Sequence, residues 1–224
     1  MNVAEVKQKI LALLKERGEA TTSQMASTLE VSYEAVRQQL KQLEAASLVQ
    51  RQRRANPAGV GRPLRYYTLS TTGDHLFYKA YDELAVALID AVAELLGREG
   101  LQRVLATLSD RQAARWAPDL AGMDLRRRLE ALQAYYVEDD AYMEVRGDGD
   151  HLQLVERNCP YLSTALQRPA LCSVTVSTLE RLLGRRVSRQ KRFQDGDGCC
   201  VFEVDVDEAL EAEARGFRFE EEPA

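Results

Sequence analysis

The chain has 224 residues, of which 45% are hydrophobic and 29% are charged, and its formal net charge is −5. This composition is typical of a soluble globular protein. No stretch is apolar for long enough to predict a membrane span, and residues 1–18 are typical of an amphipathic helix rather than a signal peptide. We therefore expect a cytoplasmic protein with no membrane partner, whose thiols stay reduced.

The charge is distributed unevenly along the chain. Residues 1–70 carry 11 Lys and Arg against 6 Asp and Glu, whereas residues 71–224 carry 19 against 29. A basic segment followed by an acidic one indicates two modules, the first of which meets a polyanion.

The first 45 residues predict three helices. Residues 4–18 have apolar side chains at helical spacing and end at Gly18. A short helix capped by Thr21 or Thr22 follows, and Ser32 caps the next helix after a tight turn. The buried stripe of that last helix is Val36, Leu40 and Leu43. This order predicts a helix-turn-helix, although a plain three-helix bundle with a solvated polar face is the alternative.

The second helix of this motif fits a DNA major groove and presents polar side chains to base edges. Gln pairs well with adenine and Arg with guanine, so both residue types are useful there. The candidate DNA-binding residues of this helix are Ser32, Tyr33, Glu34, Arg37, Gln38 and Lys41.

Residues 47–73 predict a β-hairpin wing. Leu48 and Val49 begin one strand, residues 66–69 form the other, and a basic, glycine-containing loop joins them. Such a loop can follow a phosphate backbone, and Arg62 can enter a minor groove. The candidate DNA-binding residues of the wing are Arg53, Arg54 and Arg62.

The order of these pieces resembles the winged helix-turn-helix of bacterial transcription regulators of the ArsR, MarR and DeoR types. The stretch "GRPLRYYTLSTTG" in particular is similar to the end of their wing. We therefore expect residues 1–70 to be a winged helix-turn-helix domain that binds duplex DNA.

Residues 71–140 predict a helical linker and dimerisation region. One long helix over residues 71–96 ends at Gly97, and two further helices cover residues 101–117 and 124–141. The apolar stripe of the long helix is Leu76, Phe77, Ala80, Leu84, Leu88, Val92 and Leu95. We expect this stripe to form a homodimer on a palindromic operator, unless it packs on the C-terminal half of the same chain.

Residues 141–210 predict a small α+β domain with the order ββ, helix, ββ, and residues 211–224 predict an acidic tail. The whole chain is thus expected to be α+β. All four cysteines lie in this last third, and none forms the C-x-x-C pattern of zinc ribbons or thioredoxin-type centres. Gaps of 12 and 27 residues separate Cys159, Cys172 and Cys200.

Ligands spread over a loop, a helix start and a strand need the folded domain to unite them, which favours an iron–sulfur cluster held by thiolates. Cys200 shares a strand face with Phe202 and Val204, so we expect Cys200 rather than Cys199 to face the site. Zinc at the same cysteines and simple burial of free thiols are the alternatives.

The stretches "NCPYLSTALQRPALC", "LERLLGRRVSR" and "GDGCCVFEV" resemble the cysteine domain of the Suf-operon repressor family. The resemblance implies a dimeric repressor of iron–sulfur cluster assembly genes that holds a 4Fe-4S cluster through Cys159, Cys172 and Cys200. A fourth cysteine that some members have between the second and the last is missing here. His151, Cys199 or a carboxylate is therefore left as the fourth ligand.

The last strand also resembles small-molecule-binding domains of the 4-vinyl reductase type, so an organic effector is a further alternative. No nucleophile–base spacing, glycine-rich phosphate loop or carboxylate pair indicates catalysis, and we expect the protein not to be an enzyme.

Overall fold

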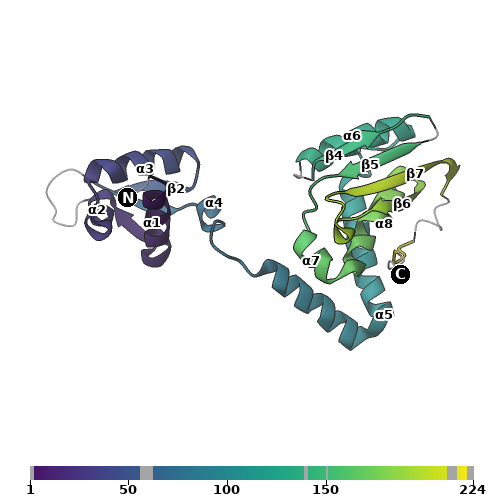
Figure 1. The fold of residues 1–224 in the computed structure, drawn as a ribbon, viewed down its shortest axis with the longest axis horizontal. Helices are drawn as coiled ribbons and strands as arrows, with labels where there is room; N and C mark the ends of the chain where they lie inside the picture. The colour runs from purple at the N-terminus through teal and green to yellow at the C-terminus, as the bar shows by residue number, and fades with distance from the viewer. Residues whose placement is uncertain (1–2, 56–62, 139–140, 150, 211–215, 221–224) are drawn as a thin grey trace. The chain divides into compact units, whose positions relative to one another are not determined.

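The structure is a computed structural model that describes residues 3–55, 63–138, 141–149, 151–210 and 216–220. The chain divides into two compact units, Met1–Lys79 and Ala80–Ala224 (Figure 1). No helix in the described ranges is both long enough and apolar enough to cross a membrane.

The first unit packs three helices against a three-stranded sheet of order β1-β3-β2 (Figure 1). Its elements are α1 (Val3–Arg17), β1 (Glu19–Thr21), α2 (Thr22–Leu29), α3 (Tyr33–Ala45), β2 (Val49–Arg54), β3 (Leu64–Leu69) and α4 (Thr71–Asp74). This is the winged helix that the sequence predicts, with β2 and β3 forming the wing.

Local sequence explains where α2 and α3 begin. The Thr21 hydroxyl accepts a hydrogen bond from the Gln24 amide at 3.3 Å, and the Gln24 side chain accepts one from the Thr21 amide at 2.8 Å. This reciprocal pair is a capping box. The Ser32 hydroxyl accepts from the Ala35 amide at 3.2 Å and starts α3. The predicted stripe of α3 is confirmed, because Val36, Leu40 and Leu43 are all buried.

The single helix predicted over residues 71–96 is wrong. The chain forms only one turn in α4, which ends at Asp74, and it enters α5 at Tyr81. The Ser70 hydroxyl caps α4 by accepting from the Gly73 amide at 2.9 Å, and it donates to the Ser47 carbonyl at 2.6 Å. These contacts tie α4 to the base of the wing, so tertiary structure overrides the local helical pattern.

The second unit is built from a four-stranded antiparallel sheet of order β4-β5-β7-β6 and the helices that pack on it (Figure 1). The helical elements before the sheet are α5 (Tyr81–Trp116) and α6 (Leu125–Glu138). The remaining elements are β4 (Met143–Arg146), β5 (Leu152–Glu156), α7 (Leu162–Gln167), the 3-10 turn η1 (Pro169–Leu171), α8 (Cys172–Leu183), β6 (Arg185–Lys191), the 3-10 turn η2 (Phe193–Asp195) and β7 (Cys200–Ala209).

The sheet of this unit joins two hairpins through the pairing of β5 with β7. Its core contains Leu129 and Leu132 from α6, Leu179 from α8 and Phe202 from β7, all fully buried. The helix break predicted at Gly97 is confirmed: its φ of 66° and ψ of −173° interrupt α5, although helix resumes directly afterwards.

Part of the predicted acidic tail is packed into the unit. Phe217 is 9% exposed and joins Leu105 of α5 and Val174 of α8 in a small apolar cluster. The sequence interpretation weighed only the net charge of this tail and overlooked its two phenylalanines, which bury apolar surface.

Candidate DNA-reading surface and cysteine pocket

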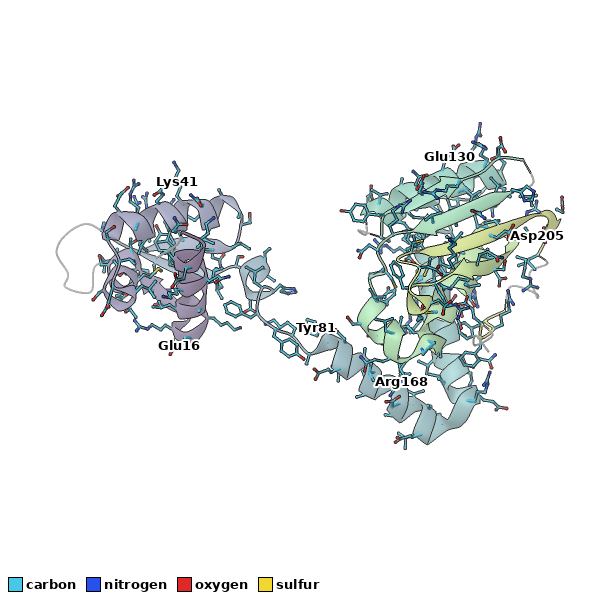
Figure 2. The ribbon with its side chains drawn as sticks, viewed as in Figure 1. Glu16, Lys41, Tyr81, Glu130, Arg168 and Asp205 are labelled. Atoms are coloured by element: carbon cyan, nitrogen blue, oxygen red, sulfur yellow. The ribbon has the colours of Figure 1, made fainter. Side chains whose placement is uncertain are left out.

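The predicted DNA-reading residues of α3 all lie on its exposed side. Val36 and Leu40 anchor the opposite face in the core, and Lys41 projects outward from the helix (Figure 2). The exposed set is Ser32, Tyr33, Glu34, Arg37, Gln38 and Lys41. The Ser32 hydroxyl is already engaged in capping the helix.

Arg37 is held in place by its neighbour on the same helix face. Its Nε donates to Glu34 Oε2 at 2.7 Å and its Nη2 donates to Glu34 Oε1 at 2.5 Å. The hydrogen bonds to Arg37 lower the pKa of the Glu34 carboxyl, and the same bonds raise the pKa of Arg37. Both groups are exposed, so the pair contributes orientation more than stability.

The three predicted wing arginines fall into different environments. Arg53 is exposed on β2. Arg54 donates to Glu19 Oε1 at 2.7 Å, and its guanidinium lies 5.1 Å from the centre of the Tyr66 ring, so intramolecular contacts hold it. Arg62 lies outside the described residues.

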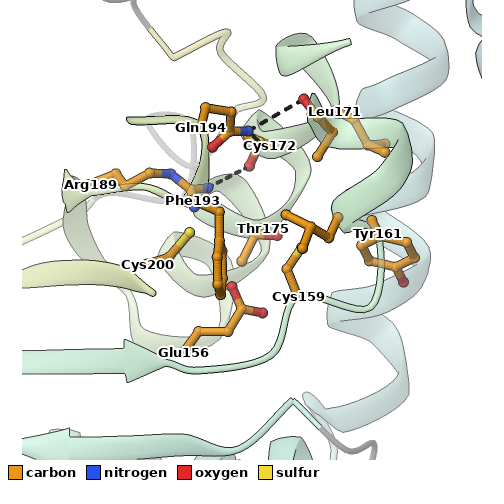
Figure 3. A pocket seen from close by; sticks show the side chains of 12 residues that line it. Glu156, Cys159, Tyr161, Leu171, Cys172, Thr175, Arg189, Phe193, Gln194 and Cys200 are labelled. Carbon is orange, nitrogen blue, oxygen red and sulfur yellow. Dashed lines mark hydrogen bonds between the residues drawn. The ribbon is translucent and has the colours of Figure 1, made fainter. Parts of the chain in front are cut away.

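The three predicted cysteine ligands line one cavity in the second unit (Figure 3). Cys159 comes from the loop before α7, Cys172 is the first residue of α8, and Cys200 is the first residue of β7. The fold thus brings together thiols that lie far apart in the sequence. Cys199 and the exposed His151, two candidates for a fourth ligand, do not line this cavity.

The pocket thiols are protonated when no metal is bound. Burial raises the pKa of Cys159 to about 12, and burial likewise raises the pKa values of Cys172 and Cys200, which Arg189 partly opposes. All four cysteines are free of disulfides. Because thiolates are the ligands of metals, binding of a metal here is coupled to release of protons.

Glu156 is a pocket residue that the sequence interpretation did not single out. It ends β5, is 3% exposed, and its Cα lies directly opposite that of Cys200 on β7. Burial raises the pKa of its carboxyl to about 7, against the attraction of Arg189. The signal was present in the strand pattern, because Glu156 alternates in phase with the buried Leu152 and Leu154.

Arg189 and Gln194 fix the inner wall of the pocket (Figure 3). The Arg189 guanidinium donates to the Cys172 carbonyl at 3.0 Å, and Gln194 Nε2 donates to the Cys172 sulfur at 2.9 Å. The Arg189 guanidinium lies 4.5 Å from the centre of the Phe202 ring. Arg189 also pairs with the Glu220 carboxylate at 2.9 Å, so its charge is shared between that group and the pocket.

The cysteine and glutamate side chains of the pocket are chemically suited to bind an iron–sulfur cluster. The cavity between them, however, is smaller than a cluster. The cavity measures about 10 Å³, which holds roughly one water molecule. Among the described residues, no three His, Cys, Asp or Glu side chains are placed to hold a single metal ion. Phe193 and Gln194 also line this space, so a cluster would enter only if these side chains moved.

A known family matches part of the first unit. Residues 5–56 match the MarR family, a segment that includes α2, α3 and β2. Among solved structures, the chain is similar to PadR of Bacillus subtilis in complex with operator DNA, at 15% identity and a TM-score of 0.29, over 78% of this chain and 94% of that one. No curated protein matches the chain.

Proposed function

We propose that the protein is a DNA-binding transcription regulator that represses iron–sulfur cluster assembly genes and is switched by a cluster in its cysteine pocket. The winged helix, the polar exposed side of α3 and the MarR match support the DNA-binding part. They support a regulator and not an enzyme.

One observation carries the cluster part of the proposal: three cysteines from a loop, a helix and a strand line the same cavity. Free cysteines buried only as small apolar residues have no reason to converge. Cys159, Cys172 and Cys200 would hold the cluster, and Arg189 would offset the negative charge of the thiolates. When bound, the cluster supplies sensitivity to oxidants and to iron supply.

We further propose that the protein acts as a homodimer on a palindromic operator. Leu84, Leu88 and Leu95 of α5 are each more than half exposed within the single chain. Leu88 also lines an apolar groove of about 320 Å³ formed by both halves of α5 and by α7. Contiguous exposed apolar surface of this kind marks a protein interface.

The oligomeric state can be tested with a charge in the interface. Leu88→Lys should shift the protein from dimer to monomer in sedimentation equilibrium, because it places a charge in an apolar contact. Glu94→Lys, on an exposed position of the same helix, is the control and should stay dimeric. A wild-type monomer at micromolar concentration contradicts the dimer proposal.

The cluster proposal is tested by anaerobic reconstitution with Fe²⁺ and sulfide. Wild-type protein and the Cys199→Ser control should bind iron and sulfide and absorb broadly in the visible range. Cys159→Ser, Cys172→Ser and Cys200→Ser should each bind far less. Operator affinity, measured before and after exposure to air, should change by about 5- to 150-fold, the usual range of allosteric coupling.

Two other results would replace the proposed cluster-sensing function with a different one. A colourless wild-type protein that binds stoichiometric zinc through the same cysteines would make it a zinc-stabilised regulator. Operator binding that responds to an organic ligand, and that survives Cys159→Ser together with Cys172→Ser, would make it an effector-binding regulator.

A further inference from the structure

We infer that Glu156 is the fourth protein ligand of the cysteine pocket and places a carboxylate oxygen beside the three sulfurs. The inference rests on the proposed cluster function and names a residue that completes its donor set. It gives the pocket three sulfur ligands and one oxygen ligand, all from one chain.

The sheet register places Glu156 on the same face as a cysteine ligand. Glu156 on β5 and Cys200 on β7 are directly opposed, and opposed residues of an antiparallel pair have Cβ atoms about 4.5–5.5 Å apart on one face. Both side chains line the cavity that Cys159 and Cys172 also line (Figure 3). In Figure 3 the Glu156 carboxyl points from the strand toward the sulfur groups.

The Glu156 side chain is nearly buried, at 3% exposure, and it lines the thiol pocket rather than the protein surface. A carboxyl in this position, beside three cysteines, has the arrangement of a metal ligand.

A second buried glutamate in the same unit shows the contrast. Glu180 of α8 is 0% exposed, and its Oε1 accepts from Arg218 at 2.9 Å, from the Val187 amide at 3.2 Å and from Arg186 at 3.3 Å. Glu180 therefore contacts structural partners through Oε1, while its Oε2 is buried without a hydrogen-bond partner among the described residues. Glu156 instead lines the thiol pocket.

The other candidates for a fourth ligand are less well placed. His151 is exposed, and Cys199 precedes β7 and does not line the pocket. Carboxylate oxygen is an established metal ligand, and it is harder than thiolate, so it binds iron in a thiol-rich site less firmly. The iron bound by Glu156 would thus be the one most easily released.

The test compares Glu156→Gln and Glu156→Cys with wild-type protein after anaerobic reconstitution with ⁵⁷Fe²⁺ and sulfide. Gln keeps the shape of the side chain but is a poor ligand, so iron release to a chelator should be at least about tenfold faster than in wild type. Glu156→Cys supplies a thiolate and should restore retention. The Mössbauer spectrum of wild type should show one distinct iron subsite that Glu156→Cys removes.

Glu203→Gln is the matched control, because Glu203 lies on β7 one position out of phase with the inward-facing Phe202 and Val204. It should release iron at the wild-type rate. Equal release rates and identical spectra for wild type and Glu156→Gln would overturn the inference while leaving the three-cysteine cluster intact. A wild-type protein that takes up no cluster would overturn both this inference and the proposed function.

Discussion

The arginines of the first unit make different intramolecular contacts. We therefore expect them to have different roles in DNA binding. Arg37 is oriented by a two-bonded pair with Glu34 on the exposed side of α3. Arg54 is held by Glu19 and Tyr66 within the sheet, whereas Arg53 is exposed on β2. An oriented guanidinium on a recognition helix suits base readout, and an exposed one on a wing suits phosphate contact.

Arg37→Ala should change sequence preference, whereas Arg53→Ala should weaken binding evenly. Loss of a bidentate contact to guanine costs about 1–3 kcal/mol at one base pair and relaxes specificity there. Loss of a phosphate contact lowers the slope of log affinity against log salt by about 1. Fluorescence anisotropy against a panel of single-base operator variants, at several salt concentrations, measures both effects.

Lys9→Ala on α1 is the control for loss of one positive charge, because Lys9 lies outside α3 and the wing and pairs with Glu5 on its own helix. It should leave the base panel unchanged. An even loss of affinity across the panel for Arg37→Ala would contradict a base-reading role and make Arg37 a phosphate contact.

At the level of single residues, strand alternation in the sequence predicted which of the two adjacent cysteines is buried. It placed Cys200 on the buried face with Phe202, and the structure shows both buried. The sequence interpretation did not single out Glu156, because a glutamate at a strand end is usually solvated. Its phase with the buried Leu152 and Leu154 indicated an inward side chain, but the pairing of β5 with β7 that places it opposite Cys200 cannot be seen in a local pattern.

The element scale shows where local pattern and tertiary contact disagree. Residues 71–96 have a helical apolar period, yet α4 stops after Asp74. Gly73 shows how closely α4 approaches the wing, because a Cβ built on it would lie 2.0 Å from the Leu48 carbonyl oxygen. The glycine that ends the wing motif therefore lets the chain return against the base of the wing.

Gly73→Ala should destabilise the first unit by about 1–3 kcal/mol, since the added methyl group meets backbone atoms that cannot yield easily. Thermal melting followed by far-UV circular dichroism measures the loss, and operator binding should weaken in parallel as the wing shifts. Thr72→Ala, at the exposed neighbouring position, is the control. A Gly73→Ala melting curve equal to wild type would show that the Leu48–Gly73 approach is not needed for stability.

At the scale of the whole chain, the second unit links the cysteine pocket to α5 through its C-terminal segment, Phe217–Glu220. Phe217 packs on Leu105 of α5, and Gln102 donates to the Phe217 carbonyl at 3.4 Å. Three residues further along, Glu220 pairs with Arg189, whose guanidinium also holds the Cys172 carbonyl. We propose this series of contacts as the route by which a change of charge at the pocket sulfurs would reach the proposed dimer helix.

Glu220→Gln tests the contact between the C-terminal segment and the pocket. The Arg189–Glu220 pair is nearly buried, at 3% and 15% side-chain exposure, and includes hydrogen bonds of 2.9 and 3.1 Å. Removing one partner of a buried pair costs about 3 kcal/mol, since the other charge is left unpaired. Urea unfolding followed by fluorescence of Trp116, the single tryptophan of the chain, reports this unit. Glu144→Gln, in an exposed pair with Arg157, should cost less than about 1 kcal/mol.

Glu220→Gln also distinguishes whether the C-terminal segment couples the pocket to α5 or only stabilises the fold. If the C-terminal segment transmits the state of the pocket, Glu220→Gln should narrow the difference in operator affinity between reconstituted and air-exposed protein, while both forms stay folded. If the segment only adds stability, Glu220→Gln lowers the urea midpoint but leaves that affinity ratio at the wild-type value, and the pocket must then reach α5 by another route. The pair of Arg168 with Asp90, which joins the end of α7 to the first half of α5, is the next contact to test in that case.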